Sequence, residues 1–273
     1  MRIFLLPVST RRTLLYCSKS STTIAGKPSI QDRIVTKANT TWTEWESATS
    51  GWKKTLTTYG NKAFSRIPFE EWGLKTLPAL HADTQSRAAK TEVLFPPSFL
   101  PAGEVRPTLR RLALDRQALH RKRMWASIGG LPLALPFGLI PILPNVPFFY
   151  LAFRAWSHYK ALYGARYLAF LLEKDLLVER GSRDLDGLYA RGLLGGVEKG
   201  EIAAEEVKSI AAEVGAGKEE PMLLSEKSGR AVAENFRLPA MQVEIERAVE
   251  QVNRDLEKAR TEKEASAGKS KES

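Results

Sequence analysis

The sequence has little cysteine and little histidine, one Cys and three His among 273 residues. Cys17 alone excludes an internal disulfide and any metal cluster built on several cysteines. His81, His120 and His158 lie far apart, without the short spacings that are typical of metal ligands. We therefore expect no metal site. A single cysteine is compatible with an oxidising or a reducing compartment.

Motifs of catalysis and of nucleotide binding are also missing. The chain holds no serine-centred elbow, no glycine-rich phosphate loop and no HExxH pattern. Its one glycine cluster, at Gly192, Gly195 and Gly196, lies between helical patterns rather than after a strand, which is typical of a helix end. We expect neither an enzyme nor a bound cofactor.

Acidic residues are missing from the first 31 positions, since Asp32 is the first of them. The same segment is rich in Ser and Thr and carries five cations, namely Arg2, Arg11, Arg12, Lys19 and Lys27. This composition is typical of a mitochondrial targeting segment. The apolar runs Ile3–Val8 and Thr13–Cys17, separated by Ser9–Arg12, also fit a β-hairpin. The two interpretations are compatible.

No charged residue lies between Arg123 and Arg154, a stretch of thirty residues. A helix that spans a bilayer needs about 20 apolar residues. Prolines interrupt the stretch, and each lacks an amide hydrogen and crowds the preceding turn. The stretch therefore predicts a bent membrane insertion, with arms near 125–140 and 148–172 and a turn at 141–147.

Basic residues flank this insertion on both sides, and cations tend to stay on one side of a membrane. A hairpin is therefore favoured, while a single kinked span and a segment lying flat or buried in protein remain open. Residues expected in the insertion are Trp125, Pro132, Pro136, Pro141, Pro144, Asn145, Pro147 and Tyr150. We expect Asn145 to cap backbone groups at the turn. Residues expected at lipid headgroups are Arg110, Arg111, Arg116, Arg121, Lys122, Arg123 and Arg154.

The expected fold is mainly α: a helical membrane protein with a proline-rich hairpin insertion and a soluble helical C-terminal region. Glu70 and Glu71 follow Pro68 and are expected in the first turn of a helix. The segments are a targeting-like or β-hairpin region at 1–31, an amphipathic helical region at 32–75, a proline-rich linker at 76–107, a basic juxtamembrane helix with the hairpin and an exit helix at 108–174, a soluble helical region at 175–260, and a disordered tail at 261–273.

Charge is divided unevenly along the chain. Residues 1–174 hold 25 Lys and Arg against 10 Asp and Glu, whereas residues 175–273 hold 16 against 21. A basic half beside an apolar stretch predicts contact with anionic membrane lipid. We expect no nucleic-acid partner, because no recognition motif accompanies the basic residues. An apolar stripe at 240–259 would suit a protein partner or a second copy of the chain.

Four segments resemble the mitochondrial K+–H+ exchange-related family, a group of mainly fungal membrane proteins. They read MRIFLLPVSTRRTLLYC at Met1–Cys17, IPFEEW at Ile67–Trp72, PILPNVPFFYLAFRAWSHYKAL at Pro141–Leu162 and LPAMQVEIERAVEQV at Leu238–Val252. The resemblance implies residence in the mitochondrial inner membrane and a part in potassium–proton exchange, as subunit, regulator or oligomeric carrier, with K+ and H+ as the transported or regulated ions. The alternative is a membrane-anchored scaffold without a transport role.

Overall fold

A computed structural model of the chain describes residues 1–18, 37, 40, 41, 43–136, 145–195, 202–217 and 219–269. The chain divides into two units. Unit 1 comprises Met1–Ser18 and Phe69–Ser273, and unit 2 comprises Lys19–Pro68. Unit 2 contains helix α2 (Trp52–Phe64), which begins directly after Gly51, a residue with φ of 91°. The helical pattern expected across 32–75 is therefore broken at this glycine, and its part at 32–36 lies outside the described residues.

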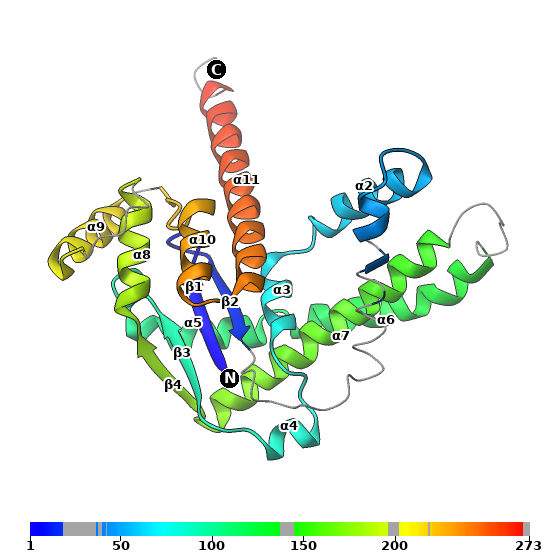
Figure 1. The fold of residues 1–273 in the computed structure, drawn as a ribbon, viewed down its shortest axis with the longest axis horizontal. Coiled ribbons are helices and arrows are strands. Elements are labelled where there is room, and N and C mark those ends of the chain that lie inside the picture. Colours follow the sequence, from blue (N-terminus) through cyan, green and yellow to red (C-terminus); the bar gives the residue numbers. More distant parts are fainter. Residues whose placement is uncertain are drawn as a thin grey trace. The chain divides into compact units, whose positions relative to one another are not determined.

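A four-stranded sheet lies at the centre of unit 1 (Figure 1). Its order is β2 (Thr13–Ser18), β1 (Arg2–Pro7), β3 (Thr91–Phe95) and β4 (Leu177–Gly181). Strand β1 pairs antiparallel with β2 and parallel with β3, and β3 pairs parallel with β4. Strands β1 and β2 are nearly continuous apolar runs, as expected for strands that are covered on both faces. The predicted N-terminal β-hairpin is confirmed.

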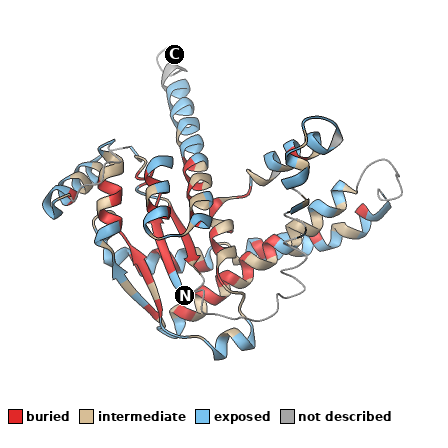
Figure 2. Ribbon diagram, viewed as in Figure 1, coloured by how far each residue is buried: buried red, intermediate tan, exposed pale blue. Residues whose placement is uncertain are grey.

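Helices cover both faces of this sheet. One face packs on α3 (Phe69–Thr76), α5 (Ala102–Leu114) and α7 (Val146–Glu173), and the other on α8 (Arg183–Leu193), α10 (Glu226–Asn235) and α11 (Pro239–Lys269). The first core includes Ile3, Leu5, Leu74, Leu109 and Leu168, and the second includes Phe4, Leu6, Tyr189, Val232 and Ile245. Figure 2 shows this burial concentrated along the strands and the inner sides of the helices. The remaining helices are α4 (Ala82–Ser86), α6 (Gln117–Ala134) and α9 (Ala204–Ala216).

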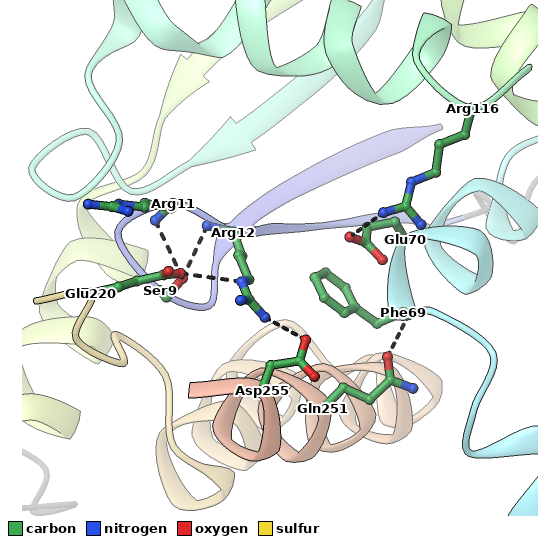
Figure 3. A network of polar contacts seen from close by, with 9 residues as sticks. All are labelled: Ser9, Arg11, Arg12, Phe69, Glu70, Arg116, Glu220, Gln251 and Asp255. Carbon is green, nitrogen blue, oxygen red and sulfur yellow. Dashed lines mark hydrogen bonds and ion pairs between the residues drawn. The ribbon is translucent and has the colours of Figure 1, made fainter. Parts of the chain in front are cut away.

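The turn between β1 and β2 is held by the C-terminal part of the chain (Figure 3). The Ser9 hydroxyl accepts the amide of Arg12 at 3.1 Å and donates to Glu220. The Arg12 guanidinium reaches Asp255 on α11 at 2.8 Å. At the start of α3, the amide of Phe69 donates to a Gln251 side chain of the same helix α11 at 2.9 Å. Helix α11 therefore anchors both the N-terminal hairpin and α3.

The predicted fold class is wrong, because the protein is mixed α/β. Strand β3 lies within the predicted proline-rich linker, and β4 lies within the region predicted to be helical. Each strand has five residues, and four of the five in β3 are buried. A short run buried on both faces does not alternate, so it carries no period-two signal.

Helices α6 and α7 pack against each other as a helical hairpin, and the described parts of the uncharged stretch, 124–136 and 145–153, lie at one end of it (Figure 1). Residues 137–144, with Pro141 and Pro144, lie outside the described residues. None of the helices in the described ranges is long and apolar enough to cross a membrane, so the predicted helical membrane insertion is not borne out. In α7 only the eight residues Val146–Phe153 precede Arg154. They extend about 12 Å at 1.5 Å per residue, against a hydrocarbon core of about 30 Å.

Asn145 fulfils the predicted capping role. Its side-chain oxygen accepts the amide of Phe148 at 3.1 Å, and its side-chain nitrogen donates to the carbonyl of Ala134 at 2.7 Å. The first contact caps α7, and the second gives a hydrogen bond to the last carbonyl of α6. At the other end of the chain, α11 continues to Lys269, into the segment expected to be disordered.

Candidate functional site: an ionisable cluster between α3, α6 and α7

The outer part of the α6–α7 hairpin exposes large apolar side chains. Leu133 is 78% exposed, Trp125 and Phe149 are each 62% exposed, and Tyr150 is 44% exposed. Among the other residues expected in the insertion, Pro132, Pro136 and Pro147 are exposed and Asn145 is half-buried. Single exposed apolar residues are common on proteins, whereas a group of them is typical of an interaction surface.

Most residues expected at lipid headgroups lie on the surface of α5 and α6. The exposed members are Arg110, Arg111, Arg121, Lys122 and Arg123. Arg116 is half-buried and pairs with Glu70 at 3.4 Å (Figure 3). Arg154 differs, because its side chain is only 11% exposed and is directed at Glu71. The expected headgroup contact of Arg154 is therefore replaced by an internal ion pair.

Glu71 is the centre of a buried group of ionisable side chains. It lies in the first turn of α3, as predicted, but its side chain is only 2% exposed. Its Oε1 atom accepts hydrogen bonds from Arg154 Nη1 at 3.0 Å and from the Ser157 hydroxyl at 2.6 Å. Burial alone would raise the pKa of Glu71, but the Ser157 hydrogen bond and the charge of Arg154 hold this pKa below its ordinary value. Glu71 is therefore a carboxylate in the folded protein.

His158 and His120 extend this group from α7 to α6. Arg154 Nη2 lies 2.9 Å from His158 Nε2, and His158 Nδ1 lies 3.1 Å from His120 Nδ1. An arginine can only donate, so His158 Nε2 accepts and the ring carries its proton on Nδ1. That proton points to His120 Nδ1, which leaves the His120 proton on Nε2. His120 Nε2 is buried without a hydrogen-bond partner among the described residues, so this N–H is left unsatisfied.

Lys75 is the member of the group that lies nearest to α11. Its ammonium donates to the Ser157 hydroxyl at 3.0 Å and lies 3.0 Å from the centre of the Trp72 ring. The guanidinium of Arg247, on α11, lies 4.2 Å from the same ring. Burial lowers the pKa of Lys75 to about 7, although Glu71 and Glu244 raise it. Lys75 therefore changes its charge near neutral pH.

Glu71, His120 and His158 each offer one atom that could bind a metal, and these atoms lie within 4.8 Å of one another. Two features disfavour an ion here. The hydrogen bond from Arg154 to His158 Nε2 keeps a proton on Nδ1, the atom that faces the other two residues. Arg154 and Lys75 also place positive charge beside the carboxylate. The arrangement therefore suits a bound proton better than a metal cation.

Sequence reasoning did not find this cluster. The spacing of His120 and His158 predicts no metal site, and the position of Glu71 after Pro68 predicts only a place in the first turn of a helix. The only local signal is the separation of Arg154 and His158 by four residues on one helix, which places them on one face. The packing of α3 and α6 against α7 completes the group, and no spacing within the sequence reports that packing.

Comparison with known proteins gives one family and relatives in two yeasts. A family model described as mitochondrial K+-H+ exchange-related matches residues 2–172. An uncharacterised protein of Schizosaccharomyces pombe is 30% identical over 186 residues, which cover 68% of this chain and 81% of that protein. An uncharacterised protein of Saccharomyces cerevisiae is 24% identical over 222 residues, which cover 70% and 69%. No solved structure matches the chain. The matched range of the family contains Glu71, His120, Arg154 and His158.

Proposed function

The chain belongs to the mitochondrial K+–H+ exchange-related family, and on that premise we propose that it serves potassium–proton exchange across the mitochondrial inner membrane as a subunit or regulator of the exchanger. The observation that carries this proposal is the family match, which covers three of the four strands, all of α6, and α7 as far as Leu172. A role beside the ion path, and not as the path itself, is favoured because the thirty residues at 124–153 include no Asp, Glu, His, Lys or Arg. The protein would thereby contribute to cation homeostasis.

Loss of the chain is expected to slow the swelling of mitochondria suspended in potassium acetate. Acetic acid carries protons into the matrix, and potassium can follow only in exchange for them. Ammonium acetate is the matched control, because ammonia crosses the membrane without an exchanger and swelling should be unchanged. Light scattering follows both processes. Equal swelling rates in potassium acetate with and without the chain would remove the proposed role.

The surface expected to seat the protein is the exposed apolar side of the α6–α7 hairpin with its adjoining cations. Trp125, Leu133 and Phe149 would lie among the headgroups of an anionic membrane surface. Arg121, Lys122 and Arg123 are exposed directly before the uncharged stretch, where negative lipids would attract them. The partner proposed for this surface is thus anionic lipid such as cardiolipin.

Neutralising these three cations is expected to weaken binding to cardiolipin-containing vesicles about 100-fold, since each cation near an anionic surface contributes about 1 kcal/mol. The variant is Arg121→Gln/Lys122→Gln/Arg123→Gln, and vesicle sedimentation measures its binding. The control Lys258→Gln/Arg260→Gln/Lys263→Gln removes the same charge from exposed positions of α11. Equal losses in the two variants would mean that net charge, and not this surface, determines binding.

The alternative role as a scaffold rested on the apolar stripe of residues 240–259. In the structure most of this stripe packs inside the protein, where Ile245, Ala248 and Val252 are fully buried in the core with α10. Val243 is exposed, at 52%. The stripe is therefore not free to bind a partner helix, and no other observation favours the scaffold over a role in exchange.

A further inference from the structure

Two histidines meet near the point where the α6–α7 hairpin leaves α3. His120 comes from α6 and His158 from α7, both side chains are buried, and their ring centres are 5.3 Å apart. The pair holds two protons. One is on His158 Nδ1 and points to His120, and the other is on His120 Nε2, where it has no partner. With these two protons, the contact between the two rings and the contact from Arg154 to His158 each join one donor to one acceptor.

A third proton cannot be added without breaking one of these contacts. Only His120 Nδ1 and His158 Nε2 are free to take it. Protonation of His120 Nδ1 would bring two N–H groups face to face across 3.1 Å. Protonation of His158 Nε2 would direct its N–H at the Arg154 guanidinium, 2.9 Å away. The first event would break the contact between the two rings, and with it one link between α6 and α7. The second would break the contact between Arg154 and the histidine four residues after it.

We propose that the His120–His158 pair is a proton-binding site, and that binding of a proton loosens α6 from α7 at the base of the hairpin. The site would let the protein respond to the H+ of potassium–proton exchange. Its connection with exchange rests on the function proposed above, whereas proton binding and helix loosening do not.

Charged groups from three helices face the pair. They are Glu71 from α3, Arg116 directly before α6, Arg123 from α6 and Arg154 from α7. Lys75 from α3 lies beside Glu71 and is itself influenced by Glu244 and Arg247 from α11. Burial lowers the pKa of both histidines, to about 4 for His158. The arginines lower these pKa values further, and Glu71 opposes them. Both rings are therefore neutral at neutral pH, and the site fills only as the pH falls below the ordinary histidine value of about 6.5.

Nuclear magnetic resonance of the full ¹⁵N-labelled chain tests the proposal. Long-range correlations report which imidazole nitrogens carry protons, and His81→Gln removes the signals of the third histidine. We expect protonated Nδ1 in His158 and protonated Nε2 in His120 at neutral pH. On acidification the two rings should titrate together, at a pH below the ordinary histidine value of about 6.5. Amide hydrogen exchange at 120–127 and 154–161, corrected for its intrinsic pH dependence, should accelerate over the same interval.

The variant His120→Gln keeps an acceptor for His158 Nδ1 but cannot bind the proton, so the acceleration should disappear. If this variant does not fold, the protonation pattern and the titration of the two rings in the native chain still test the proposal. Independent titration of the two rings near pH 6.5 would overturn the proposal. Stoichiometric Zn²⁺ binding that His120→Gln abolishes would identify a metal site instead. Proton binding combined with normal swelling after loss of the chain would leave this site intact and remove only the proposed role in exchange.

Discussion

Replacing Glu71 by glutamine is expected to lower the free energy of unfolding by about 3–5 kcal/mol, the loss typical of a buried ion pair that is deprived of one partner. Glutamine has nearly the same shape and can still accept the hydrogen bond from Ser157, so the change removes mainly the charge. The Arg154 side chain, which is only 11% exposed, would then lose the carboxylate with which it forms its ion pair. Urea unfolding followed by circular dichroism at neutral pH measures the loss.

Glu70→Gln is the matched control, one position earlier in the same turn of α3. Glu70 pairs with Arg116 at 3.4 Å, and the Arg116 side chain is 42% exposed. Surface pairs of this kind contribute about 0–1 kcal/mol, so the control should remain near native stability. A similar loss in both variants would show that the position in the helix matters and the buried pair does not.

A double replacement separates the charge from the packing. In Glu71→Leu/Arg154→Met, both members of the pair become apolar and neither leaves a charge behind. Buried pairs replaced in this way often regain their stability, so the double variant should be more stable than Glu71→Gln alone. If it is less stable, the hydrogen bonds of Glu71 to its neighbours outweigh the cost of burying its charge.

Gly164→Ala is expected to destabilise the protein by about 2–3 kcal/mol, toward the upper end of the range for overpacked sites. A Cβ atom at Gly164 in α7 would lie 2.1 Å from the carbonyl oxygen of Leu74 in α3. The obstacle is backbone, so no side-chain rotation removes the clash and the two helices must move apart. Because α3 also carries Glu71, this movement would lengthen the contacts from Arg154 and Ser157.

Gly129→Ala is the control for that substitution. Gly129 lies within α6, and no atom outside its local helix lies within 4 Å of the added Cβ. Alanine favours a helix over glycine by about 1 kcal/mol, so the control should be as stable as the native chain or slightly more stable. Thermal unfolding compares the two. A Gly164→Ala protein of native stability would mean that α3 and α7 are less closely packed than the structure shows.

Local features of the fold could be predicted from the sequence where a short segment carries its own signal. The apolar runs at Ile3–Val8 and Thr13–Cys17 predicted the first two strands, and the first-turn acids Glu70 and Glu71 predicted the start of α3. Asn145 was expected to cap freed backbone groups, and it does. In each case the residues that interact lie close together in the chain, or one residue type is strongly favoured at the position.

Features made by distant segments could not be predicted. Strand β3 pairs with β1 and β4, each more than eighty residues away, and its five residues carry no alternation. The charge-free stretch indicated a membrane insertion because composition alone cannot report that it is shared between the ends of α6 and α7, whose other parts are charged. The ionisable cluster joins positions 71, 120 and 158, and only the tertiary packing brings them together.

The sheet order determines when this protein can fold during its synthesis. Strand β1 leaves the ribosome first, but its parallel neighbour β3 ends at residue 95 and β4 ends at residue 181. Before β3 is made, the nascent chain can form only the two-stranded hairpin of β1 and β2, both of whose outer edges are open, and such edges invite pairing with other chains. Because strand pairings between distant segments form slowly, we expect these edges to stay exposed for most of the translation of the polypeptide.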